Sequence, residues 1–171
     1  MKPTSSIDEL KKIVKQLRGP NGCPWDMEQT AQSLKTYIIE EAYELTDAID
    51  SNNTEKIQDE LSDALLHVVM ISEILSETTS ISFDKVAKHS CKKMIHRHPH
   101  VFNKESDVSA DQVNKQWETQ KLNDSNDPNI FDSIPKSYPT LLKTEKIQRK
   151  ASHLGFDWPS IEGTINKLIE E

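Results

Sequence analysis

Apolar residues recur every three or four positions through most of the chain, the spacing of amphipathic helices. The first such run, from Ile7 to Leu17, predicts a helix that a capping box opens at Ser6 and that ends at Gly19-Pro20. Strand-like alternation is rare, and the chain has only 4 glycines. The pattern therefore predicts an all-α protein.

Gly, Pro and helix-capping residues divide the rest of the chain into further predicted helices. Residues 19–25 hold two Gly and two Pro and predict a shaped loop, after which Asp26 is expected to cap a helix that runs to about Asp50. A turn at 51–54 follows, and Asn53 or Thr54 is expected to cap the next helix. The remaining helices are predicted at 54–77, 82–97 (closed by Pro99), from a capping box at 109–112 through Lys121, and at about 139–153 and 160–171.

The short turn at 51–54 makes its two flanking helices antiparallel neighbours, so the predicted fold is an antiparallel helical bundle whose facing helices share one site. We expect three parts: a bundle over 1–122, a polar loop or linker over 123–136, and a C-terminal helical segment over 137–171. The last part resembles the beginning of the first. GFDW at 155–158 is similar to GCPW at 22–25, and both are followed by a Glu-Glu pair.

The composition of the chain argues against several classes of protein. A net charge of −7 argues against a protein that binds nucleic acid through its phosphates. Cys23 and Cys91 are two cysteines without a close partner, which excludes a disulfide scaffold. Neither a signal peptide nor an apolar run of about 20 residues, as a membrane span needs, is recognisable. We expect a cytoplasmic protein with no membrane partner.

Acidic pairs on the two helices of the hairpin carry the candidate chemistry. Glu41 and Glu44, like Glu60 and Asp63, are three residues apart and so share a helical face. Such pairs are often a solvated charged face, but here both lie beside the apolar stripe, where unpaired carboxylates are costly. An all-oxygen set favours Mg²⁺, with Mn²⁺ as a substitute, over Zn²⁺. A di-iron bundle would need Glu-x-x-His, whereas His67 lies one turn beyond Asp63.

These motifs resemble the MazG family of all-α NTP pyrophosphatases. EExxE, a gap of 15 residues and ExxD match its metal-binding signature, and further similar stretches follow in order. They are GCPWD at 22–26, RHPHVF at 97–102, Trp117-x-x-x-Lys121, IPKSYPTLLKTEKIQ at 134–148 and GFDW at 155–158. The resemblance implies a fold of the all-α NTP pyrophosphatase type, a homodimer, and hydrolysis of a nucleoside triphosphate to a monophosphate and pyrophosphate.

The resemblance also implies roles for individual residues. Glu41, Glu44, Glu60 and Asp63 are the implied metal ligands, and Glu40 is the acid that orients or deprotonates the attacking water. Substrate binding is implied for Lys93, Arg97, Trp117 and Lys121, and less closely for Lys56. The alternatives are core packing for Trp117, surface charge for Lys93 and Arg97, and a helix-ending role rather than Zn²⁺ binding for His96, His98 and His100.

Many family members carry two such domains in tandem, and this chain ends where a second EExxE would begin. Glu170 and Glu171 therefore have no ExxD partner. The alternative to an enzyme is a non-catalytic remnant of a tandem protein that dimerises or binds nucleotide, or a helical protein that binds a partner.

Overall fold

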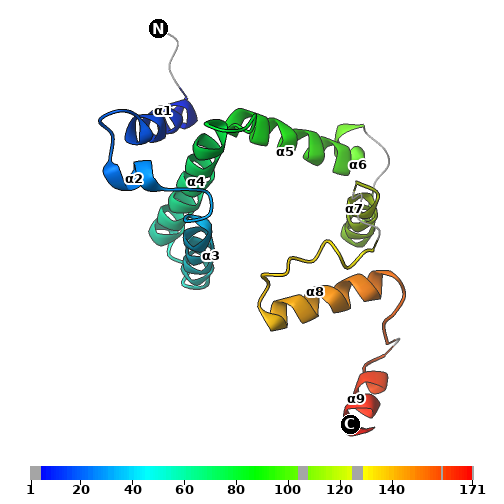
Figure 1. Cartoon of the computed structure of the whole chain (residues 1–171). Coiled ribbons are helices and arrows are strands. Elements are labelled where there is room, and N and C mark those ends of the chain that lie inside the picture. The colour runs from blue at the N-terminus through cyan, green and yellow to red at the C-terminus, as the bar shows by residue number, and fades with distance from the viewer. Residues whose placement is uncertain (1–4, 104–107, 125–128, 159, 171) are drawn as a thin grey trace. The chain divides into compact units, whose positions relative to one another are not determined.

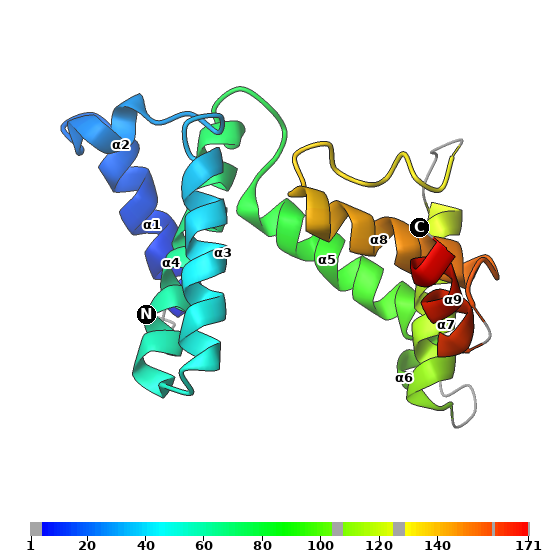
Figure 2. The same ribbon diagram turned by 90° about the horizontal axis from the view of Figure 1, so that it is seen from below.

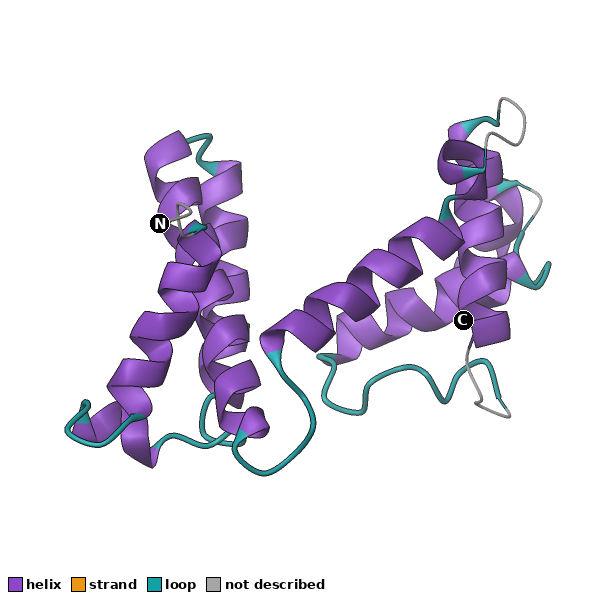
Figure 3. Cartoon of the chain, turned by 90° about the horizontal axis from the view of Figure 1, so that it is seen from above, coloured by secondary structure: helices purple, strands orange, loops and turns teal. Residues whose placement is uncertain are grey.

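A computed structural model describes residues 5–103, 108–124, 129–158 and 160–170, and every regular element in these ranges is a helix (Figure 3). This confirms the all-α prediction. The helices are α1 Ser6–Arg18, α2 Pro24–Glu28, α3 Lys35–Asp50, α4 Thr54–Ser76, α5 Phe83–Arg97, α6 Pro99–Phe102, α7 Ala110–Asp124, α8 Thr140–His153 and α9 Ile161–Glu170 (Figure 1). None of them, over the part of the chain that is described, is long and apolar enough to span a membrane.

The chain forms two compact units, Met1–Lys93 and Met94–Glu171, and the boundary between them along the sequence falls within α5. The predicted linker at 123–136 begins inside α7, and its residues 125–128, like Glu171, lie outside the described residues.

In the first unit, α3 and α4 form an antiparallel hairpin and α1 packs against α4 (Figure 2). Val14, Leu34, Val69 and Met70 make up its buried core cluster. Val14 comes from α1, Leu34 directly precedes α3, and Val69 and Met70 are neighbours on α4. Full burial of such a side chain contributes about 1.5–3 kcal/mol. The core thus fixes α1 and the start of α3 on the face of α4.

The ends of α1 follow the sequence with one correction. The predicted cap, Ser6, is wrong because Ser6 is already helical and Ser5 is the cap: its Oγ accepts from the amide of Asp8 at 3.3 Å. The predicted end at Gly19 is confirmed. Lys15 and Arg18 lie in the last turn, where positive charge stabilises the helix dipole.

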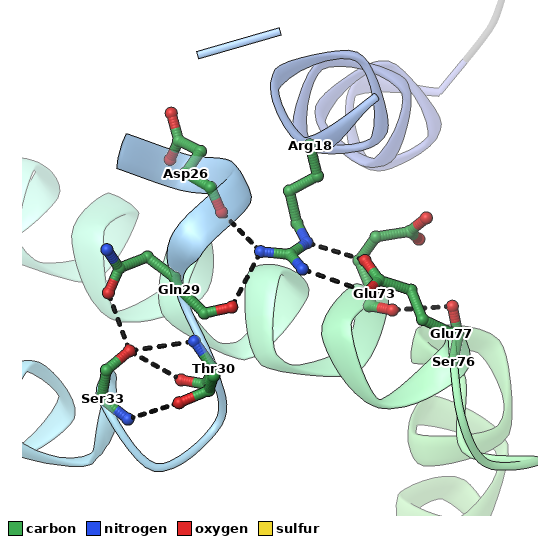
Figure 4. Close-up of polar contacts among 8 residues, drawn as sticks. All are labelled: Arg18, Asp26, Gln29, Thr30, Ser33, Glu73, Ser76 and Glu77. Carbon is green, nitrogen blue, oxygen red and sulfur yellow. Dashed lines mark hydrogen bonds and ion pairs between the residues drawn. The ribbon is translucent and has the colours of Figure 1, made fainter. Parts of the chain in front are cut away.

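The segment between α1 and α3 corrects a second prediction. Asp26 does not cap a helix to Asp50; it is buried within α2, which begins at Pro24, and α3 starts only at Lys35. The reason lies in Arg18, whose guanidinium donates to the carbonyls of Asp26 and Gln29 and so holds the chain in a turn after α2 (Figure 4).

Thr30 and Ser33 complete this turn by a reciprocal pair of bonds. The amide of Thr30 donates to Ser33 Oγ at 2.9 Å, and the amide of Ser33 donates to Thr30 Oγ1 at 3.0 Å (Figure 4). Side chains of this type compete with helix formation by satisfying the backbone locally. Leu34 follows at once and is fully buried, which fixes the start of α3.

The turn between α3 and α4 agrees with the prediction. Asn52 has φ 52°, a left-handed conformation that Asn tolerates better than most residues. Asn53 is the cap of α4, because its Oδ1 accepts from the amides of Glu55 and Lys56 at 3.0 and 3.2 Å. The two helices that carry the candidate carboxylates are therefore joined by three residues.

In the second unit, the predicted capping box of α7 is confirmed. The amide of Ser109 donates to Gln112 Oε1 at 2.8 Å, and the amide of Gln112 donates to Ser109 Oγ at 3.4 Å. The short helix α6 was not predicted. It begins because Pro99 is well suited to a first helical position, directly after α5 ends at Arg97.

Candidate functional site

Three carboxylates from the hairpin converge. Glu41 on α3 and Glu60 and Asp63 on α4 each offer an oxygen, and these oxygens lie within 4.8 Å of one another. The antiparallel pairing of α3 and α4 produces this convergence, since it sets the Glu41 turn opposite the turn that holds Glu60 and Asp63. Among the described residues this is the one group of three or more His, Cys, Asp or Glu side chains close enough to hold a metal ion.

The negative charges of this carboxylate group repel one another. The pKa of Glu60 is raised above its ordinary value by partial burial and by the charges of Glu44 and Glu41, with smaller effects from Asp59 and Asp63. Glu44 is thus near enough to repel Glu60, although it lies outside the tight group. A divalent cation relieves such repulsion, and the donors are all oxygen. The residues present therefore fit Mg²⁺ or Mn²⁺.

His67, one turn beyond Asp63, contacts the carboxylate group. Its Nε2 lies 3.4 Å from Glu41 Oε1, and the two side chains are 12% and 17% exposed. Its ring stacks on Tyr37, with 5.9 Å between centroids and 18° between planes. Sequence reasoning had considered His67 only as a metal ligand. The signal that it missed is the four-residue spacing of Tyr37 and Glu41, which puts both on the α3 face toward α4.

The other predicted residues of the first unit are Glu40, Lys56 and Lys93, and none of them belongs to the carboxylate group. Glu40 is exposed on α3 directly before Glu41, and Lys56 is exposed in the first turn of α4. Lys93 is half-buried near the end of α5. None of the described hydrogen bonds or ion pairs joins these three side chains to the carboxylates.

In the second unit, Arg97 and Trp117 lie together. The guanidinium carbon of Arg97 is 5.3 Å from the centroid of the Trp117 ring, a cation–π contact. The same guanidinium donates to Asp124 Oδ2 from Nε at 3.2 Å and from Nη2 at 2.9 Å. The ring of His98 packs edge-on against Trp117 at 5.0 Å. The cation that contacts the Trp117 ring is therefore Arg97.

Lys121 belongs to a cluster of basic side chains around Glu118. Its Nζ lies 3.3 Å from Glu118 Oε1. Burial acts to raise the pKa of Glu118, but the bond from Lys121 and the charges of Lys121, Lys146 and Lys150 outweigh it, so the pKa is lowered. The pKa of Lys146 is lowered by burial and by the charges of Lys121 and Arg149. Positive charge thus exceeds negative charge here, and Lys146 and Lys150 were not anticipated from the sequence.

The histidines near Pro99 lie where α5 ends and α6 begins: His96 is in the last turn of α5, His98 precedes α6, and His100 is in α6. His98 Nδ1 lies 2.7 Å from the carbonyl oxygen of Met94, and His98 precedes the first residue of α6. This placement agrees with the helix-ending role.

Comparison with known proteins identifies similar chains. Residues 29–102, which contain the whole carboxylate group, match the model of the MazG nucleotide pyrophosphohydrolase domain. Over 167 residues the chain is 40% identical to "Nucleoside triphosphate pyrophosphohydrolase/pyrophosphatase MazG" of Thermotoga maritima, covering 96% of this chain and 64% of that protein. Over 171 residues it is 35% identical to "Nucleoside triphosphate pyrophosphohydrolase" of Escherichia coli, covering 98% of this chain and 65% of that protein. The chain thus spans less than two thirds of these relatives.

The fold has a counterpart among solved structures. A mazG-related protein from Thermotoga maritima superposes with a TM-score of 0.56 at 22% identity, over 67% of this chain and 98% of that one. This similarity confirms the bundle that the sequence motifs implied.

Proposed function

The chain belongs to the MazG family, and we propose that it hydrolyses nucleoside triphosphates to nucleoside monophosphates and pyrophosphate with the help of Mg²⁺. The observation that supports this most directly is the convergence of Glu41, Glu60 and Asp63 inside the matched domain. In the reaction, water oxygen bonds to phosphorus while the bond that links the α- and β-phosphates breaks.

The metal-holding residues in this proposal are Glu41, Glu44, Glu60 and Asp63. A bound Mg²⁺ supplies charge neutralisation for the phosphates and lowers the pKa of a water molecule. Mn²⁺ offers the same oxygen-ligand chemistry. Glu40, exposed beside Glu41, orients the attacking water and accepts its proton.

Basic and aromatic side chains serve the substrate. On the second unit, Arg97 and Lys121 bind phosphate oxygens, and Trp117 supports Arg97 by the ring contact at 5.3 Å. On the first unit, Lys56 and Lys93 add positive charge. Phosphoryl substitution depends on this kind of positioning and neutralisation rather than on covalent help from the protein.

We propose further that the protein is a cytoplasmic homodimer. The hairpin exposes large apolar side chains, among them Ile39 at 47%, Ile49 at 52% and Leu61 at 52%, and a second copy would cover such surfaces. Sedimentation equilibrium measures the assembly directly, with a dimer mass expected.

The activity is tested by pyrophosphate release from a panel of nucleoside triphosphates with Mg²⁺ and with EDTA. Glu41→Ala and Asp63→Ala should reduce the release at least a hundredfold, while Glu9→Ala, an exposed acid on α1, serves as the matched control and should leave it unchanged. Release that is no greater in wild type than in the two site variants would favour the alternative, a chain that dimerises or binds nucleotide without turnover.

A further inference from the structure

Among the described hydrogen bonds and ion pairs, the one from another kind of side chain to a proposed metal ligand is that of His67 with Glu41. The His67 Nε2 lies 3.4 Å from Glu41 Oε1, and both side chains are largely buried. We propose that His67 is a positioning residue, which holds the Glu41 carboxylate in the orientation that binds the cation. This proposal rests on the metal site of the proposed function.

The contact uses only one oxygen of Glu41. A carboxylate has two oxygens with about four acceptor positions, so it can accept from an imidazole and still bind a cation. Without a second partner, the rotatable Glu side chain would lose conformational entropy when the cation binds. Partners of this kind around metal ligands typically change metal affinity by about 10- to 100-fold.

The surroundings of the ring favour donation from Nε2. His67 Nδ1 is buried, and no described protein group lies within hydrogen-bonding distance of it. A hydrogen on Nδ1 would have no acceptor there, and it would leave the Nε2 lone pair facing the Glu41 oxygen. An ionised carboxylate can only accept, so the tautomer with hydrogen on Nε2 is the one that forms a hydrogen bond to Glu41.

Aromatic packing fixes the plane of the ring. Tyr37, one turn before Glu41 on α3, stacks on His67, and Trp25 packs edge-on against Tyr37 with centroids 6.0 Å apart and planes at 79°. Trp25 directly precedes Asp26, whose carbonyl accepts from Arg18. The face of the imidazole is thus covered by Tyr37, which Trp25 contacts in turn, and the turn that carries Trp25 is held by Arg18 of α1.

Two substitutions distinguish the hydrogen bond that His67 donates from the space that its ring fills. His67→Gln keeps an N–H donor of similar reach, whereas His67→Leu fills much of the space without a donor. His89→Leu is the matched control, because His89 is exposed on α5. The full chain is used throughout, and circular dichroism with thermal unfolding in EDTA verifies that each variant is folded.

The primary measurement is Mn²⁺ affinity by isothermal titration calorimetry without substrate. We expect His67→Leu to weaken binding at least tenfold, and His67→Gln and His89→Leu to stay within about threefold of wild type. In turnover assays, the Mg²⁺ concentration for half-maximal rate should rise in His67→Leu, while kcat at saturating Mg²⁺ and KM for the triphosphate change little.

Several outcomes would overturn the proposal. A folded His67→Leu that binds Mn²⁺ like wild type, or equal losses in the Leu and Gln variants, would show that donation to Glu41 has no role. If His67→Leu does not fold, long-range ¹H–¹⁵N spectra of the wild type decide: hydrogen on Nδ1 contradicts the proposal. Wild type without Mn²⁺ affinity would remove the metal site itself. Lack of turnover together with the expected affinity loss would overturn only the proposed activity.

Discussion

Replacing Arg18 by Met should destabilise the protein by about 3 kcal/mol, mainly through two backbone carbonyls rather than through the ion pair. The Arg18 side chain is only 7% exposed, and its guanidinium lies between the turn after α2 and the end of α4 (Figure 4). It donates to the carbonyls of Asp26 and Gln29 and pairs with both oxygens of Glu77. Methionine keeps the apolar stem but supplies no donor.

The magnitude follows from the exposure of each partner. A hydrogen bond from a charged donor contributes about 1.5–3 kcal/mol, and the two carbonyls regain some hydration in the variant, so the lower end of that range applies to each. Glu77 is 46% exposed, so its pairing contributes less than about 1 kcal/mol after solvent screening. For a chain of 171 residues, a loss of about 3 kcal/mol lowers the unfolding midpoint by roughly 6–12 °C.

Urea unfolding of Arg18→Met, Glu77→Gln and the double variant measures these parts separately. We expect a coupling energy below about 1 kcal/mol between the two positions. Arg149→Met, at an exposed arginine on α8, is the control and should shift stability by no more than about 0.5 kcal/mol. A loss below 1 kcal/mol in Arg18→Met, or a coupling energy that accounts for most of the loss, would refute the assignment to the carbonyls.

Three further predictions concern Glu77, Glu60 and Leu34. The bond from Arg18 lowers the pKa of Glu77 in the folded state, so the pairing stabilises the folded protein above pH 4.5, the ordinary pKa, and is lost as the pH falls through the folded pKa. The difference in unfolding free energy between wild type and Glu77→Gln should therefore shrink below about pH 4.5, as urea titrations at several pH values would measure. Burial and the charges of Glu44 and Glu41 raise the pKa of Glu60 in the folded state, so its ionised form opposes folding at neutral pH. Glu60→Gln should therefore raise the thermal unfolding midpoint in EDTA, and it should abolish the rise in midpoint that Mg²⁺ produces in wild type. A lower midpoint of the variant in EDTA would contradict this. Leu34 is fully buried, so Leu34→Ala should cost about 2–5 kcal/mol in urea unfolding, whereas a cost under 1 kcal/mol would show that the start of α3 does not depend on it.

Several features that depend on neighbouring residues were predicted from the sequence, although the cap of α1 lies at Ser5 rather than at Ser6. The three-residue turn with its Asn53 cap, and the reciprocal Ser109–Gln112 box, are local patterns. The convergence of Glu41 with Glu60 and Asp63 was also predictable, because two pairs with helical spacing on a tight hairpin have few arrangements. Their roles, and that of Glu44, stay predictions.

Features that depend on distant side chains were not predictable in this way. Apolar periodicity alone suggested one helix from Asp26 to Asp50, and the break before Lys35 depends on Arg18, which reaches the turn from α1. Likewise the carboxylate of Asp124, expected to lie in a polar linker, ends α7 and pairs with Arg97 across 27 positions of sequence. Local propensity contains no information about such pairings.

The short turn at Ser51–Asn53 has a consequence for how the acidic site assembles. All four proposed ligands lie between positions 41 and 63, so closing this hairpin brings them together with a small loss of chain entropy, since that loss grows with loop length. Local contacts of this kind favour fast folding. The site is therefore encoded in a single hairpin, against which α1 packs through α4.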